Sequence, residues 1–426
     1  MYLVEMEVER RWAGRYLIGR YSRTFRTWRR SVFDTGLDPE VIRTVIEDGS
    51  KGGESVVLVA PFFAGNIVMP AIESLRRVLL YTPYPLDAFL ARAVSSLPES
   101  VRFREEADRI IESTRGRINA LFELEGKCGA CGTNLVARSI RFGSLRAYAR
   151  CPSCGEKETF KYKLTPGDLE RLNRLEEKHI KGWHPDELAG GGRLGDFFTR
   201  RSIHAHSILF EKIKTVRDPD VRDALFWCFI EAVGGMRAAY ERYRYLPYRE
   251  ERNPAPLFEN EVDEMEQRLP GSRKGLHYFF KTGSTDEVIA GEATFAHERE
   301  LDSLPPDSVD VAVATIPSSS LKPLPDYERV LTAWLAGYGE IEDGLELSDL
   351  EKYFRGVRRV IRPGGRMNVM VEDMPEAVDA LMAVEPILYS LGFKRIGSLP
   401  ETGPDEKDKT DRMSSRNLQA LVYVKA

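Results

Sequence analysis

Four cysteines in this chain have a spacing that suits a metal ion. They form two Cys-x2-Cys pairs, with residues 132–150 between the pairs: Cys128, Cys131, Cys151 and Cys154. Two thiolates that close one short turn can bind the same ion, and two such turns are typical of a four-thiolate zinc site. Gly132 and Gly155 follow the pairs and leave room for backbone N–H groups to turn toward sulfur. We therefore predict that these four cysteines bind zinc.

The segment between the two pairs is rich in β-forming residues and in arginine. This composition predicts a zinc ribbon whose strands carry a basic surface. We expect Arg141 and Arg146 to contact nucleic acid on that surface. The alternative is that the ribbon only braces an insertion in the fold.

A second basic segment lies near the beginning of the sequence. Eight arginines and no acidic residue occur between Arg10 and Arg30, interleaved with tryptophan, tyrosine and phenylalanine. Arginine with aromatic residues suits phosphate contacts and base stacking, and Arg26, Arg29 and Arg30 are the candidate contacts. An amphipathic segment whose aromatic residues pack on the protein body would have the same composition.

The overall composition describes a soluble globular protein. The chain has 426 residues, which is enough for two or three domains. Of its residues 42% are hydrophobic and 30% are charged. The net charge of −4 means that any contact with nucleic acid must come from local patches. No apolar run is long enough to span a membrane and no apolar signal core is visible, so we expect a cytoplasmic protein without a membrane partner. The fifth cysteine, Cys228, lies in an apolar run and is expected to be buried in a helix.

The elements at the two ends of the chain predict an α/β sheet. In the first segment a helix is expected over 39–47, followed by a strand over 55–59, a helix near 67–76, a strand over 77–81 and a helix over 85–95. In the last segment we expect strands over 308–314 and 367–371, helices over 327–338, 347–358 and 375–391, and an antiparallel edge pair over 395–398 and 419–424. Gly392 suits the left-handed cap of the last helix.

Helices dominate the middle of the chain. They are predicted over 100–125, 166–178, 203–215 and 220–243, whereas the polar stretch 249–274 is predicted to be irregular. The resulting domain organisation has four parts: an N-terminal basic segment with the first half of the α/β domain (1–100), the zinc ribbon (101–164), a helical insertion (165–275) and the second half of the α/β domain (276–426).

The order of these elements resembles the zinc-ribbon-containing adenine-specific DNA methylases, a family of S-adenosylmethionine-dependent amino-methyltransferases. The stretches that carry the resemblance are the ribbon, 198–243, 304–314, 326–335 and 360–366. The resemblance implies an α/β fold, in which a Rossmann-like class I methyltransferase sheet carries an inserted zinc ribbon and a helical recognition region. It also implies S-adenosylmethionine as a cofactor, bound at the carboxyl ends of the strands.

The cofactor motifs of the family are altered in this chain. Asp-Pro-Phe-x-Gly-x-Gly corresponds to residues 60–66, where Pro61, Phe62 and Gly65 are retained and alanine replaces the acid. The acid that accepts hydrogen bonds from the ribose corresponds to Thr82. These residues are the candidates for cofactor binding.

The catalytic loop is altered as well. The family's Asp-Pro-Pro-Tyr accepts the amino protons of a flipped base and stacks on it. Here the loop reads Thr315-Ile-Pro317-Ser318, so the acid and the aromatic ring are both absent. Glu292 is a further candidate polar contact to the cofactor, and its alternative is an ordinary turn carboxylate.

Three functions are compatible with this pattern. The first is a catalytically silent methyltransferase-fold protein that binds DNA or RNA, or a protein partner. The second is an active DNA or RNA methyltransferase with a divergent pocket, in which the hydroxyls of Thr315 or Ser318 replace the acid. The third is a structural subunit of a larger complex. Binding of S-adenosylmethionine separates the first two, and salt-dependent nucleic-acid binding separates both from the third.

Overall fold

The computed structural model of the 426-residue chain divides into two compact units. Unit 1 comprises 1–96, 279–323 and 342–426, and unit 2 comprises 97–278 and 324–341. The structure describes residues 39–53, 55–61, 71, 74–81, 89, 93, 97–154, 160–176, 180, 182–188, 192–234, 250–269, 283–293, 295–298, 301–316, 326–338, 349–372, 375–399 and 418–425. None of the described helices is long and apolar enough to cross a membrane.

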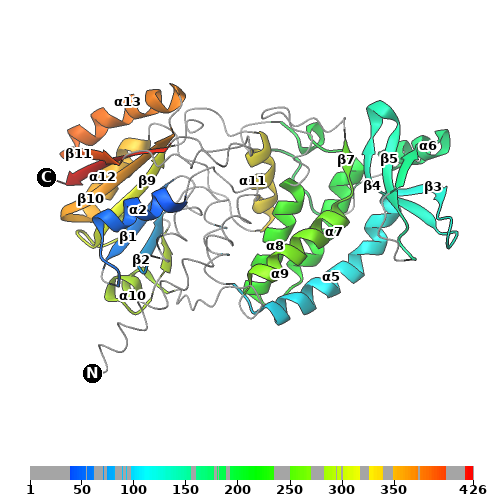
Figure 1. The fold of residues 1–426 in the computed structure, drawn as a ribbon, viewed down its shortest axis with the longest axis horizontal. Helices are drawn as coiled ribbons and strands as arrows, with labels where there is room; N and C mark the ends of the chain where they lie inside the picture. The colour runs from blue at the N-terminus through cyan, green and yellow to red at the C-terminus, as the bar shows by residue number, and fades with distance from the viewer. Residues whose placement is uncertain are drawn as a thin grey trace, which may run out of the picture. The chain divides into compact units, whose positions relative to one another are not determined.

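Unit 1 is built on a mostly parallel sheet (Figure 1). Its described strands follow the order β11-β12-β10-β9-β1-β2-β8. Their bounds are β1 Val56–Pro61, β2 Arg77–Tyr81, β8 Phe295–Glu298, β9 Val309–Ile316, β10 Ile361–Glu372, β11 Phe393–Leu399 and β12 Leu418–Lys425. Neighbours from β10 to β8 run parallel, whereas β12 is antiparallel to both β10 and β11. The predicted α/β sheet, mostly parallel with an antiparallel pair of strands at one edge, is therefore confirmed.

Helices cover both faces of this sheet. The described helices of unit 1 are α2 Pro39–Gly49, α10 Thr285–Ala290, α12 Asp349–Val360 and α13 Pro375–Ser390. Ala312 and Ala314 of β9 belong to the core that includes α12 and α13. Val311 points the other way, and a Cβ on Gly49 of α2 would lie 3.1 Å from it. Because successive strand residues face opposite sides, α2 lies on the opposite face from α12 and α13.

Unit 2 contains a helical bundle and a second sheet. Its described helices are α5 Ser100–Leu121, α6 Pro166–Glu176, α7 Arg200–Lys214, α8 Pro219–Gly234, α9 Pro254–Arg268 and α11 Asp326–Tyr338. α8 is apolar on nearly all sides, which marks a helix enclosed by others. It carries the buried Cys228, as predicted. Trp334 of α11 packs edge-on against Phe229 of α8, so α11 belongs to the core of the bundle.

The prediction that 249–274 is irregular was wrong over 251–268. The chain forms β7 Glu251–Arg252 and then α9. Asn253 caps α9 by accepting a hydrogen bond from the N–H of Ala255, and Pro254 occupies the first turn. The helix buries Phe258, Val262 and Met265 at helical spacing among charged residues, and this apolar stripe was missed because the stretch is polar overall.

The remaining differences from the predicted elements are small. β10 runs without a break through residues 363–366, where a turn was expected, and its register shifts between Ile361 and Arg366. Gly364 supports that irregularity with a φ of +75°. Gly392 caps α13 with a φ of +80°, as predicted. The helices expected over 67–76 and 85–95 lie largely outside the described residues, as does the part of the predicted 220–243 helix beyond Gly234.

Candidate functional site

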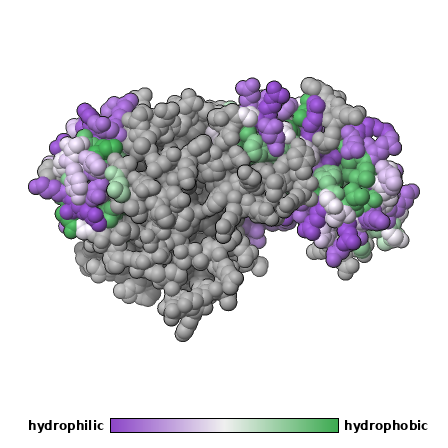
Figure 2. Space-filling model, turned by 90° about the horizontal axis from the view of Figure 1, so that it is seen from above, coloured by the Kyte–Doolittle hydropathy of each residue, from purple (hydrophilic) through white to green (hydrophobic). Residues whose placement is uncertain are grey.

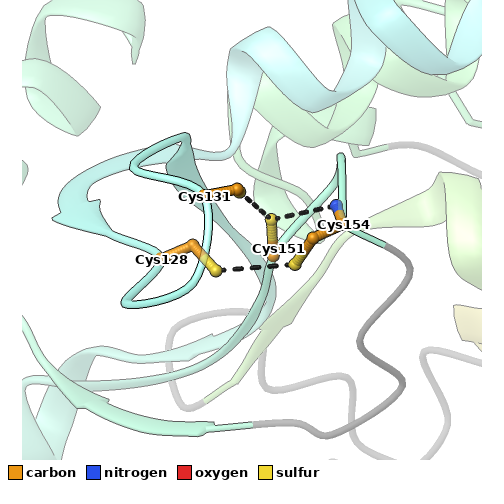
Figure 3. A group of neighbouring side chains, drawn as sticks. All are labelled: Cys128, Cys131, Cys151 and Cys154. Carbon is orange, nitrogen blue, oxygen red and sulfur yellow. Dashed lines mark hydrogen bonds between the residues drawn. The ribbon is translucent and has the colours of Figure 1, made fainter.

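The four predicted zinc ligands lie together in the ribbon of unit 2 (Figure 3). The ribbon's described strands are β3 Glu123–Lys127, β4 Asn134–Arg141, β5 Arg146–Arg150 and β6 Phe160–Lys163, and β7 pairs with β4. One cysteine pair follows β3 and the other follows β5, and their Sγ atoms all lie within 4.8 Å of one another. Across the two turns, Cys128 Sγ lies 3.5 Å from Cys154 Sγ, and Cys131 Sγ lies 3.4 Å from Cys151 Sγ.

Backbone hydrogen bonds shape these turns. Cys128 donates its N–H to the carbonyl of Thr133, and Gly132 donates to the carbonyl of Cys128. Gly132 has a φ of +70°, a conformation that a side chain would strain. In the second turn the N–H groups of Cys154 and Ser153 point at Cys151 Sγ from 3.5 and 3.4 Å. These two donors lower the pKa of the Cys151 thiol to about 6.

The sulfur arrangement fits a tetrahedral zinc ion. Zinc–sulfur bonds of about 2.3 Å place tetrahedral sulfurs roughly 3.8 Å apart. The two cross-turn distances lie a few tenths of an ångström below that value. Thiolates are the ligands that structural zinc prefers, and the N–H groups aimed at Cys151 stabilise its anionic form.

A buried carboxylate joins the ribbon to α6. Asp168 accepts hydrogen bonds from the N–H groups of Glu125 and Thr165 and from the hydroxyl of Tyr162. Burial alone would raise the pKa of Asp168, but these bonds outweigh it and hold the pKa below its ordinary value. The cysteine turn after β3 is therefore attached to the helical bundle by an acid rather than by apolar packing alone.

The predicted basic surface of the ribbon is present on β4, β5 and β6. Arg141 and Arg146 are both exposed and are register partners. Arg141 pairs with Glu250 at 3.0 Å, and its guanidinium lies 5.2 Å from the ring centre of Tyr148. Lys163 of β6 lies opposite Arg146 on the other side of β5. Arg26, Arg29 and Arg30 of the N-terminal basic segment lie outside the described residues.

Sequence reasoning missed two contributors to the ribbon. Lys161 and Lys163 extend the cationic surface, and their alternation along a short strand was the signal that would have found them. The second contributor is the buried ion pair between Arg201 of α7 and Glu251 of β7, which left no signal in the sequence because its members are 50 residues apart.

In unit 1, the predicted cofactor and catalytic loops begin at neighbouring strand ends. Pro61 ends β1 and is the register partner of Thr315 in β9. From β1 the chain continues to β2 on one side, whereas β9 and β10 lie on the other. Such a switch of direction is where open parallel sheets bind ligands. Phe62, Gly65, Thr82, Pro317 and Ser318 lie outside the described residues.

Glu292 lies at the opposite end of the sheet from Pro61 and Thr315. It is exposed in the turn between α10 and β8, where its N–H donates to the carbonyl of Glu287 at 2.7 Å. β8 runs parallel to β2, so this turn lies at the amino end of the strands, away from the ends of β1 and β9. The alternative reading of Glu292 as a turn carboxylate fits this position.

No protein-family model matches the chain, and no curated protein does. Similar solved structures include a protein of Thermus thermophilus described as a DNA modification methylase, with 20% identity, a TM-score of 0.18 and coverage of 34% of this chain and 51% of that one. A structure of that Thermus methylase with S-adenosyl-L-methionine has 18% identity and a TM-score of 0.18, covering 34% of this chain and 54% of that one. An S-adenosylmethionine-dependent methyltransferase of Mesorhizobium loti has 14% identity and a TM-score of 0.19, covering 35% of this chain and 82% of that one. This chain spans about half the length of the Thermus protein.

Proposed function

We propose that this protein binds nucleic acid through a methyltransferase fold whose methyl-transfer activity is lost or much reduced. The observation that carries the proposal is the lack of acids at the strand ends by the switch point of the sheet, where Pro61 pairs with Thr315. The frame that would hold a cofactor is retained there, but β1, β2 and β9 end in Pro61, Tyr81 and Ile316 rather than in acids.

The missing acids have a large expected effect. A hydrogen bond to a charged group contributes about 1.5–3 kcal/mol, and stacking of a base on an aromatic ring about 1–3 kcal/mol. The chain has Ala60, Thr82 and Thr315 at the positions where the methylase family that it resembles has carboxylates. Losing these groups together lowers affinity or rate by several orders of magnitude, which supports reuse of the fold for binding.

Nucleic acid is the partner that the cationic surfaces favour. The ribbon presents Arg141, Arg146 and Lys163 side by side on three strands, in a molecule whose net charge is negative. Clustered cations in an otherwise acidic protein suit a polyanion. The four cysteines would hold zinc and so fix the strands that carry these residues.

Titration of the zinc-loaded, full-length protein with S-adenosylmethionine by calorimetry tests the proposal, together with fluorescence anisotropy on labelled DNA and RNA. We expect salt-dependent binding of nucleic acid and no binding of S-adenosylmethionine up to millimolar concentration. Absence of nucleic-acid binding at low salt would refute the proposed function.

An active methyltransferase with a divergent pocket is the second candidate. It is favoured by the retained adjacency of Pro61 and Thr315, which would still bring a cofactor loop and a catalytic loop together. Micromolar binding of S-adenosylmethionine would support it. Transfer of a labelled methyl group to DNA or RNA, abolished in Thr315→Val, would then establish it.

A further inference from the structure

The hairpin between β4 and β5 exposes an apolar residue at its tip. The turn consists of Phe142–Ser144 and Leu145, and it connects Arg141 to Arg146. Leu145 is 44% exposed. Close to half of its surface therefore remains open to water, and that part gains nothing from packing within the protein.

The backbone at this residue is also unusual. Leu145 has a φ of 51° and a ψ of 44°, the left-handed region that favours glycine or asparagine. Its N–H donates to the carbonyl of Phe142 at 3.2 Å, and its own carbonyl accepts from the N–H of Leu164 at 3.0 Å. The turn is therefore fixed on both sides, and it presents a leucine where glycine would be the less strained residue.

Like charges surround this tip. Arg146 lies directly opposite Arg141 on one neighbouring strand and opposite Lys163 on the other, and all three are exposed. Like charges directly opposite each other destabilise a sheet. Within the described residues Arg141 pairs with Glu250, whereas no acidic side chain pairs with Arg146 or Lys163. A polyanion that covers these three cations would compensate the repulsion between them.

We propose that this hairpin binds duplex DNA by inserting Leu145 between base steps, while Arg141, Arg146 and Lys163 contact the flanking phosphates. The inference rests on the proposed function and gives it a substrate class. An apolar side chain inserted beside cations is a known way to unstack a base step. Such wedges enter B-form DNA from the minor groove and kink it toward the major groove, while cationic side chains contact the adjacent phosphates.

The surface around the hairpin agrees with this partner. In Figure 2 the ribbon end of the surface shows apolar side chains bordered by hydrophilic ones. Tyr148 lies beneath the guanidinium of Arg141 at 5.2 Å, and exposed Lys161 lies opposite Tyr148 on β6. The cations therefore continue from the tip along the strands.

The test uses the zinc-loaded, full-length protein and a DNA duplex with one 2-aminopurine, whose fluorescence rises when its base step unstacks. Wild type is expected to bind and raise the fluorescence. Leu145→Gly is expected to bind about 10-fold more weakly, to lose the fluorescence rise and to keep the wild-type salt dependence. Its Tm is not lowered, because glycine adopts a φ of 51° freely.

Leu75→Gly is the matched control. Leu75 is also a leucine with a left-handed φ, 57°, and is 45% exposed, but it lies in unit 1. This variant is expected to keep both affinity and fluorescence. Arg146→Gln, in contrast, should lower the slope of log K against log salt by about 0.9 and keep the fluorescence rise at saturation.

Three outcomes would overturn this inference, and they differ in what they leave of the function on which it rests. If wild type binds DNA but Leu145→Gly matches it in affinity and fluorescence, the insertion is wrong and nucleic-acid binding stands. If wild type binds no nucleic acid, both proposals fail. Binding to vesicles of phosphatidylserine and phosphatidylcholine without binding to the duplex would identify the tip as a lipid-inserting hairpin and overturn the inference.

Discussion

Cys151 accepts hydrogen bonds from the backbone of its own turn. Two backbone N–H groups point at its sulfur, and they lower the pKa of its thiol to about 6. A thiol of this kind is largely ionised at neutral pH before any metal binds. The second turn therefore favours the anionic form of the sulfur, which is the form that binds zinc.

Replacing one zinc ligand should remove the metal. We expect Cys128→Ser to reduce bound zinc from one ion per chain to a small fraction and to lower stability, because metal-binding free energy is coupled to folding of the ribbon. Zinc content by mass spectrometry and thermal unfolding measure the two effects. Cys228→Ala is the control, since Cys228 is buried in α8, and it should retain zinc. An unchanged zinc content in Cys128→Ser would refute the metal site.

His206 should make the stability of unit 2 depend on pH. Burial lowers the pKa of His206 from 6.5 to about 4, and its Nε2 has no hydrogen-bond partner in the described structure. The histidine of the unfolded chain binds a proton more tightly than buried His206 does. The contribution of neutral His206 to the free energy of unfolding is therefore complete above pH 6.5 and is lost as pH falls toward 4. We expect a loss of roughly 3 kcal/mol over that range.

Urea unfolding followed by tryptophan fluorescence from pH 7.5 to 4 measures this effect. His206→Phe suits the aromatic surroundings of Phe198, Phe229 and Trp334 and removes the titrating group. The variant should lose about 3 kcal/mol less than wild type over the same range. The same pH dependence in both proteins would contradict the assignment to His206.

At the scale of elements, one buried ion pair joins α7 to β7. Arg201 and Glu251 are each 1% exposed, the hydroxyl of Thr199 donates to Glu251 at 2.6 Å, and Arg201 donates to the carbonyl of Leu172 at 3.0 Å. Removing one partner leaves a buried charge without its counterion. Arg201→Met should therefore lower the free energy of unfolding by about 3–5 kcal/mol.

Chemical unfolding of Arg201→Met and of Arg174→Met gives the comparison. Arg174 forms an exposed pair with Glu170 one helical turn away in α6, where a change of less than about 0.5 kcal/mol is expected. Equal effects of the two substitutions would mean that the buried pair does not hold α7 to β7.

Local patterns predicted most elements but not their tertiary partners. The apolar run of β9 and the capping glycine of α13 are readable because their causes lie within a few residues. α9 was not predicted because its apolar stripe lies among charged residues. The cysteine site was predictable because spacing alone fixes two turns. The alignment of Arg141, Arg146 and Lys163 was not, because strand register depends on turn geometry across three strands.

For the whole molecule, the N-terminal basic segment is a further candidate contact for nucleic acid. Changing Arg26, Arg29 and Arg30 to glutamine should lower the slope of log K against log salt for DNA binding by about 2.7, because each lost phosphate contact releases one fewer counterion. Anisotropy titrations at several salt concentrations measure the slope.

A control variant with the same change in net charge separates contact from general electrostatics. Arg102, Arg109 and Arg174 are exposed on α5 and α6, and their replacement by glutamine should leave the slope nearly unchanged. If both triple variants lower the slope equally, the N-terminal arginines act through net charge and not through phosphate contacts.

The sheet joins residues that are made at very different times. Val56 of β1 donates its N–H to the carboxylate of Asp310 in β9, 254 residues later. At about 5–20 residues per second, a ribosome needs on the order of 10–50 seconds to deliver β9 after β1 has emerged. During that interval the apolar strand β1 lacks one neighbour, while the cysteine turns and most of unit 2 have already left the ribosome. We therefore expect the nascent chain to depend on a chaperone that holds its N-terminal half until the central strand arrives.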